Sequence, residues 1–379
     1  MAERIKVMHL VTRMNVGGVA VLLDNLMSYI DKGQFHARLV MGACELPEGE
    51  YLEGRTTEYE VVRIESFHKS LKFKDDFVSF VSICKHLREF KPDVIHTHTS
   101  KAGLFGRIAA SIVLPKAKVV HTFHGHLLVG YFNPIKLKIV KTIEKTLGLL
   151  SNTLIAMGTQ VMEDLVRVGI APRAKFKVFF PGLTKPIFPE KIAAREALGL
   201  ETNRTYCVFI GRLTQIKRPD RILEIAAITM RDDQDVEFLI VGDGELASDL
   251  KTRALAANLP VTFLGWRQDI PAILKASDIA LLTSDNEAVA LTLIEATQAG
   301  LPIVTTAAGS VRDVAVNGEN GYVLGFESQE MADAILKLVR NPELREEFGQ
   351  AGMRRSETLF SIEKMVSDHE RLYLELLSN

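Results

Sequence analysis

Short runs of apolar residues recur along the chain at the length of β-strands, and helical patterns lie between them. The runs lie at 5–11, 93–99, 118–123, 206–211, 237–244, 261–266, 278–284 and 301–306. Their centres are rich in Val, Ile, Leu and Phe, which is typical of parallel strands covered on both faces. Segments with helical periodicity separate them, among them 20–30, 77–90 and 218–230. This alternation predicts an α/β protein with doubly wound parallel sheets.

The strand–helix pattern starts twice, which predicts two domains. One start, at Ile5, leads into the glycine loop RMNVGG, and the other, at Tyr206, leads into GRL. The segment FFPGLTKPIFPE at 179–190 is rich in proline and reads as a linker between them. We therefore expect Rossmann-like domains over 1–183 and 190–360, each of ordinary domain size.

Composition narrows the classes of function. The chain has 379 residues, and its net charge of −1 disfavours a generally basic nucleic-acid binder. Three scattered cysteines form no CxxC pair, so neither a zinc ribbon nor a disulfide framework is indicated. The chain begins without the pattern of a signal peptide, and no apolar stretch approaches the roughly 18 residues that span a membrane. We expect a cytoplasmic protein.

Two carboxylates bracket the apolar part of SDNEAVALTLIEATQAG at 284–300. Glu287 follows a strand and a run of good N-capping residues, and Glu295 lies within a helix expected to begin near Val289 and to end at Gly300. Ligands of open α/β sheets bind at this edge, where the first N–H groups of a helix favour a phosphate. The carboxylates are then placed to bind hydroxyls of a ribose and a sugar. Two solvated glutamates on a surface helix are the alternative, because E-x7-E is a loose pattern.

Two loops after predicted strands are further candidates for a phosphate site. Arg212 and Lys217 follow the strand at 206–211 and could neutralise a diphosphate without a metal ion, although a solvated loop is the alternative. Gly17 and Gly18 follow the first strand and permit close approach of the backbone to a ligand. A simple tight turn explains them equally well, and the complete GxGxxG fingerprint of a dinucleotide site is absent.

Five of the ten histidines fall in HTHT at 96–99 and HTFHGH at 121–126. HxH along a strand places both rings on one face, so a zinc site is one interpretation and hydrogen-bonded structural histidines are the favoured one. His124, just before Gly125, is the best candidate to face a ligand. Asp233 and Asp235 form a DxD pattern, but it precedes a strand and reads as a solvated turn. We therefore expect no metal site.

Taken together, these segments resemble the family 4 retaining glycosyltransferases of the GT-B fold over nearly the whole chain. The resemblance rests on the order and spacing of NVGG, KPDVIHTHTSKAG, HTFHGH, GRL-x3-K, VGDGE, FLGWRQDI, TSDNE-x7-E, AGLPIVTT and NGENGYVL. It implies two Rossmann-like domains facing a central cleft, with a C-terminal helix at 361–379 crossing back to the first domain. The most similar enzymes known to us act in bacterial surface-polysaccharide or related glycan assembly.

The resemblance also implies roles in binding a nucleotide-sugar donor. Glu295 would bind the nucleotide ribose and Glu287 the donor sugar. Arg212 and Lys217 would hold the diphosphate, joined by the backbone of the Gly17–Gly18 loop. UDP is the commonest nucleotide of the family, and no separate cofactor is expected.

Four more positions carry implied roles. Backbone amides around Leu291 would meet the phosphates, Trp266 and Arg267 would lie beside the base, and His124 would lie near the reacting carbon of the sugar. Catalysis would then depend on His124, Glu287, Arg212 and Lys217. Retention by front-face attack needs no protein base, because the leaving phosphate accepts the proton; the glutamates are therefore not the acid–base pair of a glycosidase.

The sequence departs from the family in the loop Ala288–Val289–Ala290, where relatives commonly carry glycine and proline (NEGTP). This loop lines the expected sugar pocket, so it leaves open a non-catalytic nucleotide-sugar-binding or scaffold protein of the same fold. A UDP-N-acetylglucosamine 2-epimerase is another alternative within the fold. A Rossmann dehydrogenase is a weaker one, for want of the dinucleotide fingerprint.

The acceptor is expected to be a glycan, a lipid-linked glycan or a small molecule. A basic segment at 131–146 runs into a helix predicted to begin at Pro134, and it carries Lys136, Lys138, Lys141 and Lys145. Lysines and aromatic residues there could rest on anionic lipid at the inner face of the cytoplasmic membrane. A solvated helix face is the alternative.

Overall fold

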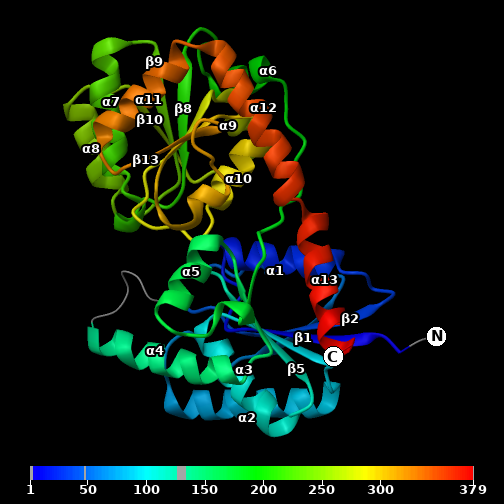
Figure 1. Cartoon of the computed structure of the whole chain (residues 1–379). Helices are drawn as coiled ribbons and strands as arrows, with labels where there is room; N and C mark the ends of the chain where they lie inside the picture. The colour runs from blue at the N-terminus through cyan, green and yellow to red at the C-terminus, as the bar shows by residue number, and fades with distance from the viewer. Residues whose placement is uncertain (1–2, 47, 126–133, 379) are drawn as a thin grey trace. The chain divides into compact units, whose positions relative to one another are not determined.

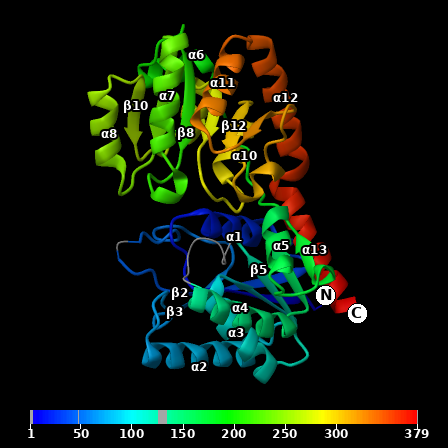
Figure 2. The same ribbon diagram turned by 60° about the vertical axis from the view of Figure 1, so that its left-hand side comes forward.

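The computed structural model describes residues 3–46, 48–125 and 134–378, and the chain folds into two compact units (Figure 1). Unit 1 comprises Met1–Gly182 and Ile362–Asn379, and unit 2 comprises Leu183–Ser361. Each unit has one parallel sheet with helices on both faces, as two views of the ribbon show (Figures 1 and 2). The predicted α/β class with doubly wound sheets is confirmed.

The sheet of unit 1 has seven parallel strands in the order β3-β2-β1-β4-β5-β6-β7. These are β1 (Ile5–Val11), β2 (Phe35–Gly42), β3 (Glu60–Ile64), β4 (Val94–His98), β5 (Lys118–Phe123), β6 (Thr153–Ala156) and β7 (Phe176–Val178). The helices are α1 (Gly18–Tyr29), α2 (Phe73–Phe90), α3 (Ser100–Val113), α4 (Pro134–Leu149), α5 (Thr159–Arg167) and α13 (Ile362–Ser378), with the 3-10 turn η1 (Arg173–Lys175). Helices α2, α3 and α4 cover one face, and α13 packs against α1 on the other. The C-terminal helix thus returns to the first unit, as the family resemblance implied.

The sheet of unit 2 has six parallel strands in the order β10-β9-β8-β11-β12-β13. These are β8 (Thr205–Ile210), β9 (Val236–Val241), β10 (Val261–Gly265), β11 (Ile279–Leu282), β12 (Ile303–Thr306) and β13 (Gly321–Leu324). Its helical elements are α6 (Lys191–Leu198), η2 (Gln215–Lys217), α7 (Asp220–Asp232), α8 (Ala247–Ala256), α9 (Ile270–Ala276), α10 (Leu291–Gln298), η3 (Gly309–Asp313), α11 (Ser328–Val339) and α12 (Pro342–Leu359). Helix α7 packs with α8 and α11, while α10 packs with α9 and α12.

Every strand predicted from the sequence exists, with ends shifted by a few residues. Strands β2, β3, β6, β7 and β13 were not predicted. The DxD pattern lies in the turn between α7 and β9, where the Asp235 N–H donates to Asp233 Oδ1 at 3.0 Å. It is a turn at the amino edge of the sheet, as expected.

A buried ion pair fastens α4 to α3. The Arg107 guanidinium, which is fully buried, donates to Glu144 Oε2 at 2.8 Å and to the Gly103 carbonyl at 2.8 Å. Burial lowers the pKa of Arg107, and the nearby Glu144 carboxylate opposes that shift. Because a buried charge is tolerated only when it is paired, the carboxylate of α4 is required where α3 presents its arginine.

Replacement of Glu144 by alanine is expected to destabilise the protein by about 3–5 kcal/mol, because it leaves a buried guanidinium without a counter-charge. The double variant Arg107→Leu/Glu144→Leu should lose much less, since no uncompensated charge remains. Urea unfolding of both variants measures the difference. If the double variant lost as much as the single one, lost packing rather than the orphaned charge would be the cause.

Candidate functional site

The candidate residues of unit 2 gather where its sheet changes direction. In the strand order β10-β9-β8-β11-β12-β13, the connections run one way from β8 and the other way from β11. The loops after these two neighbouring strands leave the same, carboxyl edge of the sheet and diverge, which is the usual ligand site of open α/β sheets. Arg212 and Lys217 follow β8, and Glu287 and Glu295 follow β11.

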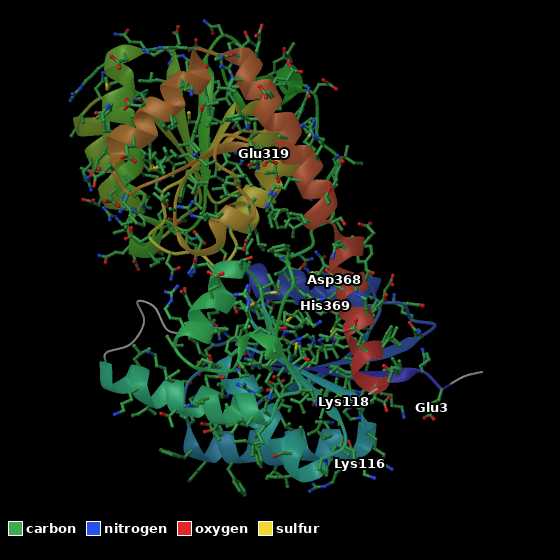
Figure 3. The ribbon with its side chains drawn as sticks, in the orientation of Figure 1. Glu3, Lys116, Lys118, Glu319, Asp368 and His369 are labelled. Atoms are coloured by element: carbon green, nitrogen blue, oxygen red, sulfur yellow. The ribbon has the colours of Figure 1, made fainter. Side chains whose placement is uncertain are left out.

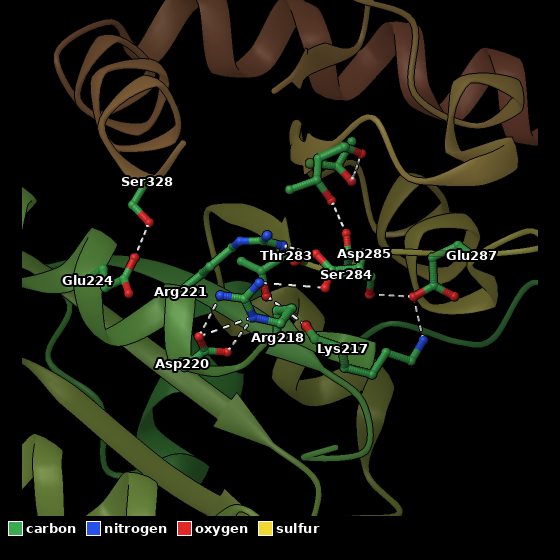
Figure 4. A network of polar contacts seen from close by, with 12 residues as sticks. Lys217, Arg218, Asp220, Arg221, Glu224, Thr283, Ser284, Asp285, Glu287 and Ser328 are labelled. Carbon is green, nitrogen blue, oxygen red and sulfur yellow. Dashed lines mark hydrogen bonds and ion pairs between the residues drawn. The ribbon is translucent and has the colours of Figure 1, made fainter. Parts of the chain in front are cut away.

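Lys217 and Glu287 meet directly at this edge (Figure 4). Lys217 Nζ donates to Glu287 Oε1 at 2.5 Å, and Ser284 Oγ donates to the same oxygen at 2.5 Å. Glu287 is 9% exposed and Lys217 is half-buried, so little water screens the pair. The sequence placed both residues at one site, and the structure adds that they form an ion pair.

Two arginines that sequence reasoning missed hold the two loops together (Figure 4). Arg221, buried on α7, donates to the Thr283 carbonyl at 2.8 Å and pairs with Asp285 Oδ1 at 2.6 Å. Arg218 pairs with Asp285 Oδ2 at 3.5 Å, and Thr283 Oγ1 donates to the Lys217 carbonyl at 3.0 Å. Arg218 lies between η2 and α7, and Arg221 lies in the first turn of α7, so both are close to the loop that carries the glutamate.

The loop that departs from the family pattern is firmly held. The Glu287 carbonyl accepts from the Ser310 N–H at 3.2 Å, and Gly309 lies against it with φ +56°. A side chain at Gly309 would place its Cβ 1.9 Å from the Glu287 carbonyl oxygen, so only glycine fits there. Ala290 is buried, and the loop Ala288–Val289–Ala290 therefore leaves Glu287 anchored on both its side chain and its backbone.

Helix α10 offers open N–H groups beside Glu287. It begins at Leu291 rather than near Val289, because Ala290 keeps extended angles of φ −76° and ψ 101°. Within the described part of the chain no side chain caps this helix, and its first turn carries no acidic residue. The first-turn amides and the positive end of the helix dipole are thus available to an anion.

Glu295 lies in the second turn of α10, half-buried. Burial raises its pKa to about 7. Among the described residues its carboxyl has neither a hydrogen-bond donor nor a cationic partner. A carboxyl that is desolvated and without donors gains most from a ligand that brings hydroxyl groups.

The structure places the other predicted residues of unit 2 less centrally. Arg212 is exposed and lies in the loop that follows β8, one of the two strands that flank the switch point. Trp266 is 65% exposed and follows β10, which lies two strands away from β8 at the margin of the sheet. Arg267 is bound to Asp269 through two hydrogen bonds, the longer of 2.7 Å. These side chains share the carboxyl edge with Lys217 but do not contact it.

Unit 1 has its own switch point, between β1 and β4. Gly17 and Gly18 begin α1 there, and a Cβ on Gly17 would meet no atom closer than 3.8 Å, so the glycine is not required by packing. His124 follows β5 and is half-buried. His126 and the residues up to 133, which include the start of the basic segment, lie outside the described residues.

The histidines of unit 1 form a buried cluster that extends beyond the two motifs. His9 on β1 and His369 on α13 join His96 and His98 on β4, and spacing along the chain does not predict their proximity. His369 is labelled on α13 in Figure 3. Ring nitrogens of His9, His96 and His98 lie within 4.8 Å of one another, which is close enough for a metal ion. Five of their six nitrogens already have partners: His9 with His98, His98 with His124, and His96 with Tyr373 and Thr122. We therefore interpret the cluster as a hydrogen-bonded network, while the expectation of no metal stays a prediction.

No helix in the described ranges is both long and apolar enough to cross a membrane.

Two family models match the chain. The model described as Glycosyltransferase Family 4 matches residues 16–184, and the model described as Glycosyl transferases group 1 matches residues 190–355. Together they cover most of both units.

Similar proteins span the whole chain. An Escherichia coli enzyme named UDP-Gal:alpha-D-GlcNAc-diphosphoundecaprenol alpha-1,3-galactosyltransferase is 28% identical over 100% of this chain and 98% of its own. The capsular polysaccharide biosynthesis glycosyltransferase CapM of Staphylococcus aureus is 22% identical over 97% of this chain and 96% of its own. Among solved structures, Anabaena Alr3699/HepE in complex with UDP aligns over 98% of this chain and 100% of its own, with a TM-score of 0.82 and 20% identity. The last likeness supports the fold.

Removal of the Glu295 charge is expected to stabilise the unliganded protein above neutral pH. The pKa of Glu295 is about 7 in the folded state against 4.5 for an unperturbed glutamate, so the folded state binds more protons between these values. Stability therefore falls as pH rises from about 4.5 to 7. Glu295→Gln should be more stable than the parent by up to about 3 kcal/mol at pH 8 and nearly equal to it at pH 5. Unfolding at the two pH values tests this, and a difference independent of pH would contradict it.

Proposed function

Since the chain belongs to the family 4 glycosyltransferases and adopts the GT-B fold, we propose that it is a retaining enzyme that transfers a hexose from a UDP-sugar to a hydroxyl of a glycan or lipid-linked acceptor, without a metal. The observation that supports this donor site best is the meeting of Lys217 and Glu287 beside the open N-terminus of α10. A diphosphate needs cations and N–H donors, and a sugar needs a carboxylate. The switch-point edge of unit 2 offers all three.

The reaction places negative charge on the leaving diphosphate and positive charge on the anomeric carbon. Arg212, Lys217 and the amides at Leu291 would stabilise the first, and Glu287 would bind hydroxyls of the sugar that carries the second. Glu295, with its unsatisfied carboxyl, would accept hydrogen bonds from the ribose. Trp266 and Arg267 remain our assignment for the base, and Gly17, Gly18 and His124 remain donor-site assignments that rest on the family resemblance.

Ligand binding would exchange partners at Lys217. In the unliganded protein its ammonium group is neutralised by Glu287 at 2.5 Å. A diphosphate would attract Lys217 more strongly than one carboxylate does, and a sugar hydroxyl would then occupy the lone pairs of Glu287 that are freed. Lys217 would then pair with the diphosphate, and the Ser284 hydroxyl, which donates to Glu287 in this structure, would still be in reach of that carboxylate.

The enzyme from Escherichia coli is named for an acceptor on diphosphoundecaprenol, and we extend a lipid-linked acceptor to this chain. Two helices on one face of unit 1 suit a lipid surface. Helix α4 exposes Ile139 and Ile143 beside Lys138 and Lys145. An amphipathic, basic helix face of this kind binds anionic bilayers in the plane of the headgroups.

Helix α2 adds an aromatic stripe to the same face. Phe73, Phe77 and Val81 are 97%, 70% and 49% exposed, and they recur every four residues. Lys72 and Lys74 flank Phe73. Helices α2 and α4 cover the same side of the unit 1 sheet (Figures 1 and 2). Exposed aromatic residues among lysines favour a bilayer over a second protein, whose interface core would be depleted of lysine.

Substitution of Lys217 tests the donor site. The parent protein should gain about 2.7 kcal/mol of apparent stability at a UDP concentration 100-fold above its Kd. Lys217→Ala should bind UDP at least about tenfold more weakly, since a charge-assisted contact to phosphate is worth about 1.5–3 kcal/mol. Thermal shifts with UDP, UDP-galactose and UDP-glucose measure this, with Lys251→Ala on the exposed surface of α8 as the matched control. Unchanged shifts in Lys217→Ala would remove this residue from the site, and no shift in the parent would favour a scaffold protein.

Flotation with lipid vesicles tests the surface of unit 1. The parent should float with vesicles containing phosphatidylglycerol and not with phosphatidylcholine alone. Phe73→Ser/Phe77→Ser should reduce the floating fraction several-fold, because aromatic residues supply much of the interfacial affinity. The control is Leu255→Ser, since Leu255 is 84% exposed on α8 of unit 2. Equal flotation of all three proteins would exclude α2 as the contact.

A further inference from the structure

Three histidines of unit 1 form a chain from the centre of the sheet to its carboxyl edge. His9 Nδ1 lies 3.1 Å from His98 Nε2, and His98 Nδ1 lies 3.0 Å from His124 Nε2. His9 and His98 are fully buried on β1 and β4, and His124 follows β5 and is half-buried. His124 and His98 border a small cavity of unit 1, of about 10 Å³, together with His369, Thr122 and apolar side chains.

Both ends of this chain lack a protein partner. His9 Nε2 and His124 Nδ1 are buried, and neither forms a hydrogen bond within the described part of the molecule. A neutral imidazole carries one N–H donor and one acceptor nitrogen. If each link is a hydrogen bond, the three rings must therefore point the same way. One end of the chain is then an N–H group and the other a lone pair, so the tautomer of His9 decides that of His124.

The three rings are neutral. Burial lowers the pKa of His9 to about 3 and that of His124 to about 4, with a further contribution from nearby His369 in both cases. Burial also lowers the pKa of His98, and the neighbouring His96 adds to this. The other titratable groups around the chain are His121 on β5 and Tyr373 on α13, together with Asp368 beside His369. Near pH 7 the three imidazole rings of His9, His98 and His124 thus carry three protons on their six nitrogens.

The surroundings of the two ends fix the direction. The inner end, at His9, is packed against the rings of His96, His98 and Tyr373, with no access to water. No cavity adjoins the inner nitrogen in the described part of the molecule, whereas His124 borders one in which a water or a ligand oxygen can accept a hydrogen bond. The N–H group is therefore assigned to His124 and the lone pair to His9. His9 then donates to His98, His98 donates to His124, and the N–H group at the far end lies on the ring that borders the cavity.

We propose that His9 and His98 are positioning residues that hold His124 as a neutral Nδ1–H tautomer, ready to donate a hydrogen bond to an oxygen of the ligand. The geometry that carries this is the pair of imidazole links of 3.1 and 3.0 Å together with the unpartnered nitrogen at each end. A sugar hydroxyl or a phosphate oxygen can accept such a bond. A His124 with the lone pair at Nδ1 would instead require a hydroxyl donor and would repel a phosphate oxygen.

The tautomer can be observed without a substrate. Protein labelled with 15N-histidine reports Nδ1–H and Nε2–H forms by their different nitrogen shifts, and His124→Gln assigns the signals. We expect Nδ1–H at His124 in the parent at pH 7. His98→Phe should move His124 toward Nε2–H, because its Nε2 loses the donor. His98→Asn should restore Nδ1–H, since an amide N–H then lies near the position of His98 Nδ1.

His96→Gln is the matched control. His96 is equally buried on the same strand, but its nitrogens bind Tyr373 and Thr122 at 2.7 Å each and do not join the chain. It should leave the His124 signals unchanged. Nε2–H or an imidazolium at His124 in the parent would overturn the proposal, as would the same spectrum in the parent and His98→Phe. Circular dichroism identifies a variant that fails to fold, and the spectrum of the parent decides the question in that case.

The effect of the His9–His98–His124 contacts on catalysis rests on the proposed donor reaction and is tested separately. With UDP-galactose and UDP-glucose as probes, His98→Phe should lower kcat for donor cleavage at least tenfold with KM changed less than threefold. His98→Asn should recover most of the loss, and His96→Gln should resemble the parent. A predicted tautomer without any donor cleavage in the parent would contradict the proposed function alone. A wrong tautomer with normal cleavage would contradict the histidine chain alone.

Discussion

The placement of every candidate residue depends on the winding of parallel strands. A right-handed crossover forces successive strands to progress in one direction, so a sheet with helices on both faces must change direction once. That change falls between β8 and β11 in unit 2 and between β1 and β4 in unit 1. Two loops diverge there and leave the backbone at the edge uncovered. Lys217 and Glu287 meet because their loops follow the two strands that adjoin this point.

Both units also bury polar side-chain groups that have no hydrogen-bond partner among the described residues. Glu295 carries a raised pKa because its carboxyl is desolvated, and the nitrogens at both ends of the histidine chain are orphaned. Each of these groups lowers the stability of the unliganded protein. A ligand that supplies hydroxyl donors to Glu295 would recover part of that free energy on binding, which links the instability of the free site to affinity. The stability of the fold is supplied elsewhere, by the burial of continuous apolar strands and the helices packed on them.

The sequence predicted the elements whose pattern is strong and missed those whose pattern is weak. Strands β1, β8 and β9 are long apolar runs and were found. Strand β2 was missed because FHARLVMG alternates polar and apolar residues in its first half, and β6 and β7 were missed because TLIA and FKV are too short to show a period. Helix α10 begins at Leu291, two residues after the predicted start near Val289, because Ala290 has an extended backbone. Periodicity alone does not determine that backbone conformation.

The site was predictable to the same degree. Residues within one loop, such as Arg212 and Lys217, could be grouped from spacing, and the order of strands placed Glu287 near them. The buried contacts could not be predicted from spacing. Arg221 reaches the Thr283 carbonyl, and His9 reaches His98, only because strands that are distant in the sequence pair with each other. Contacts across a sheet depend on register, and the register of β1 with β4, which sets His9 opposite His96, is a property of the whole sheet.

The polar groups of the unit 2 edge are ionised, whereas the buried histidines of unit 1 are neutral. The difference follows from the charges that surround each group. At the edge of unit 2 the charged residues are paired: Lys217 with Glu287, Arg218 with Asp220, and Arg221 with Asp285. Ionised groups persist there because each of these three carboxylates has a cation within hydrogen-bond distance. In unit 1, His9, His98 and His124 have no anion beside them and are neutral, so they can act only through the direction of their hydrogen bonds.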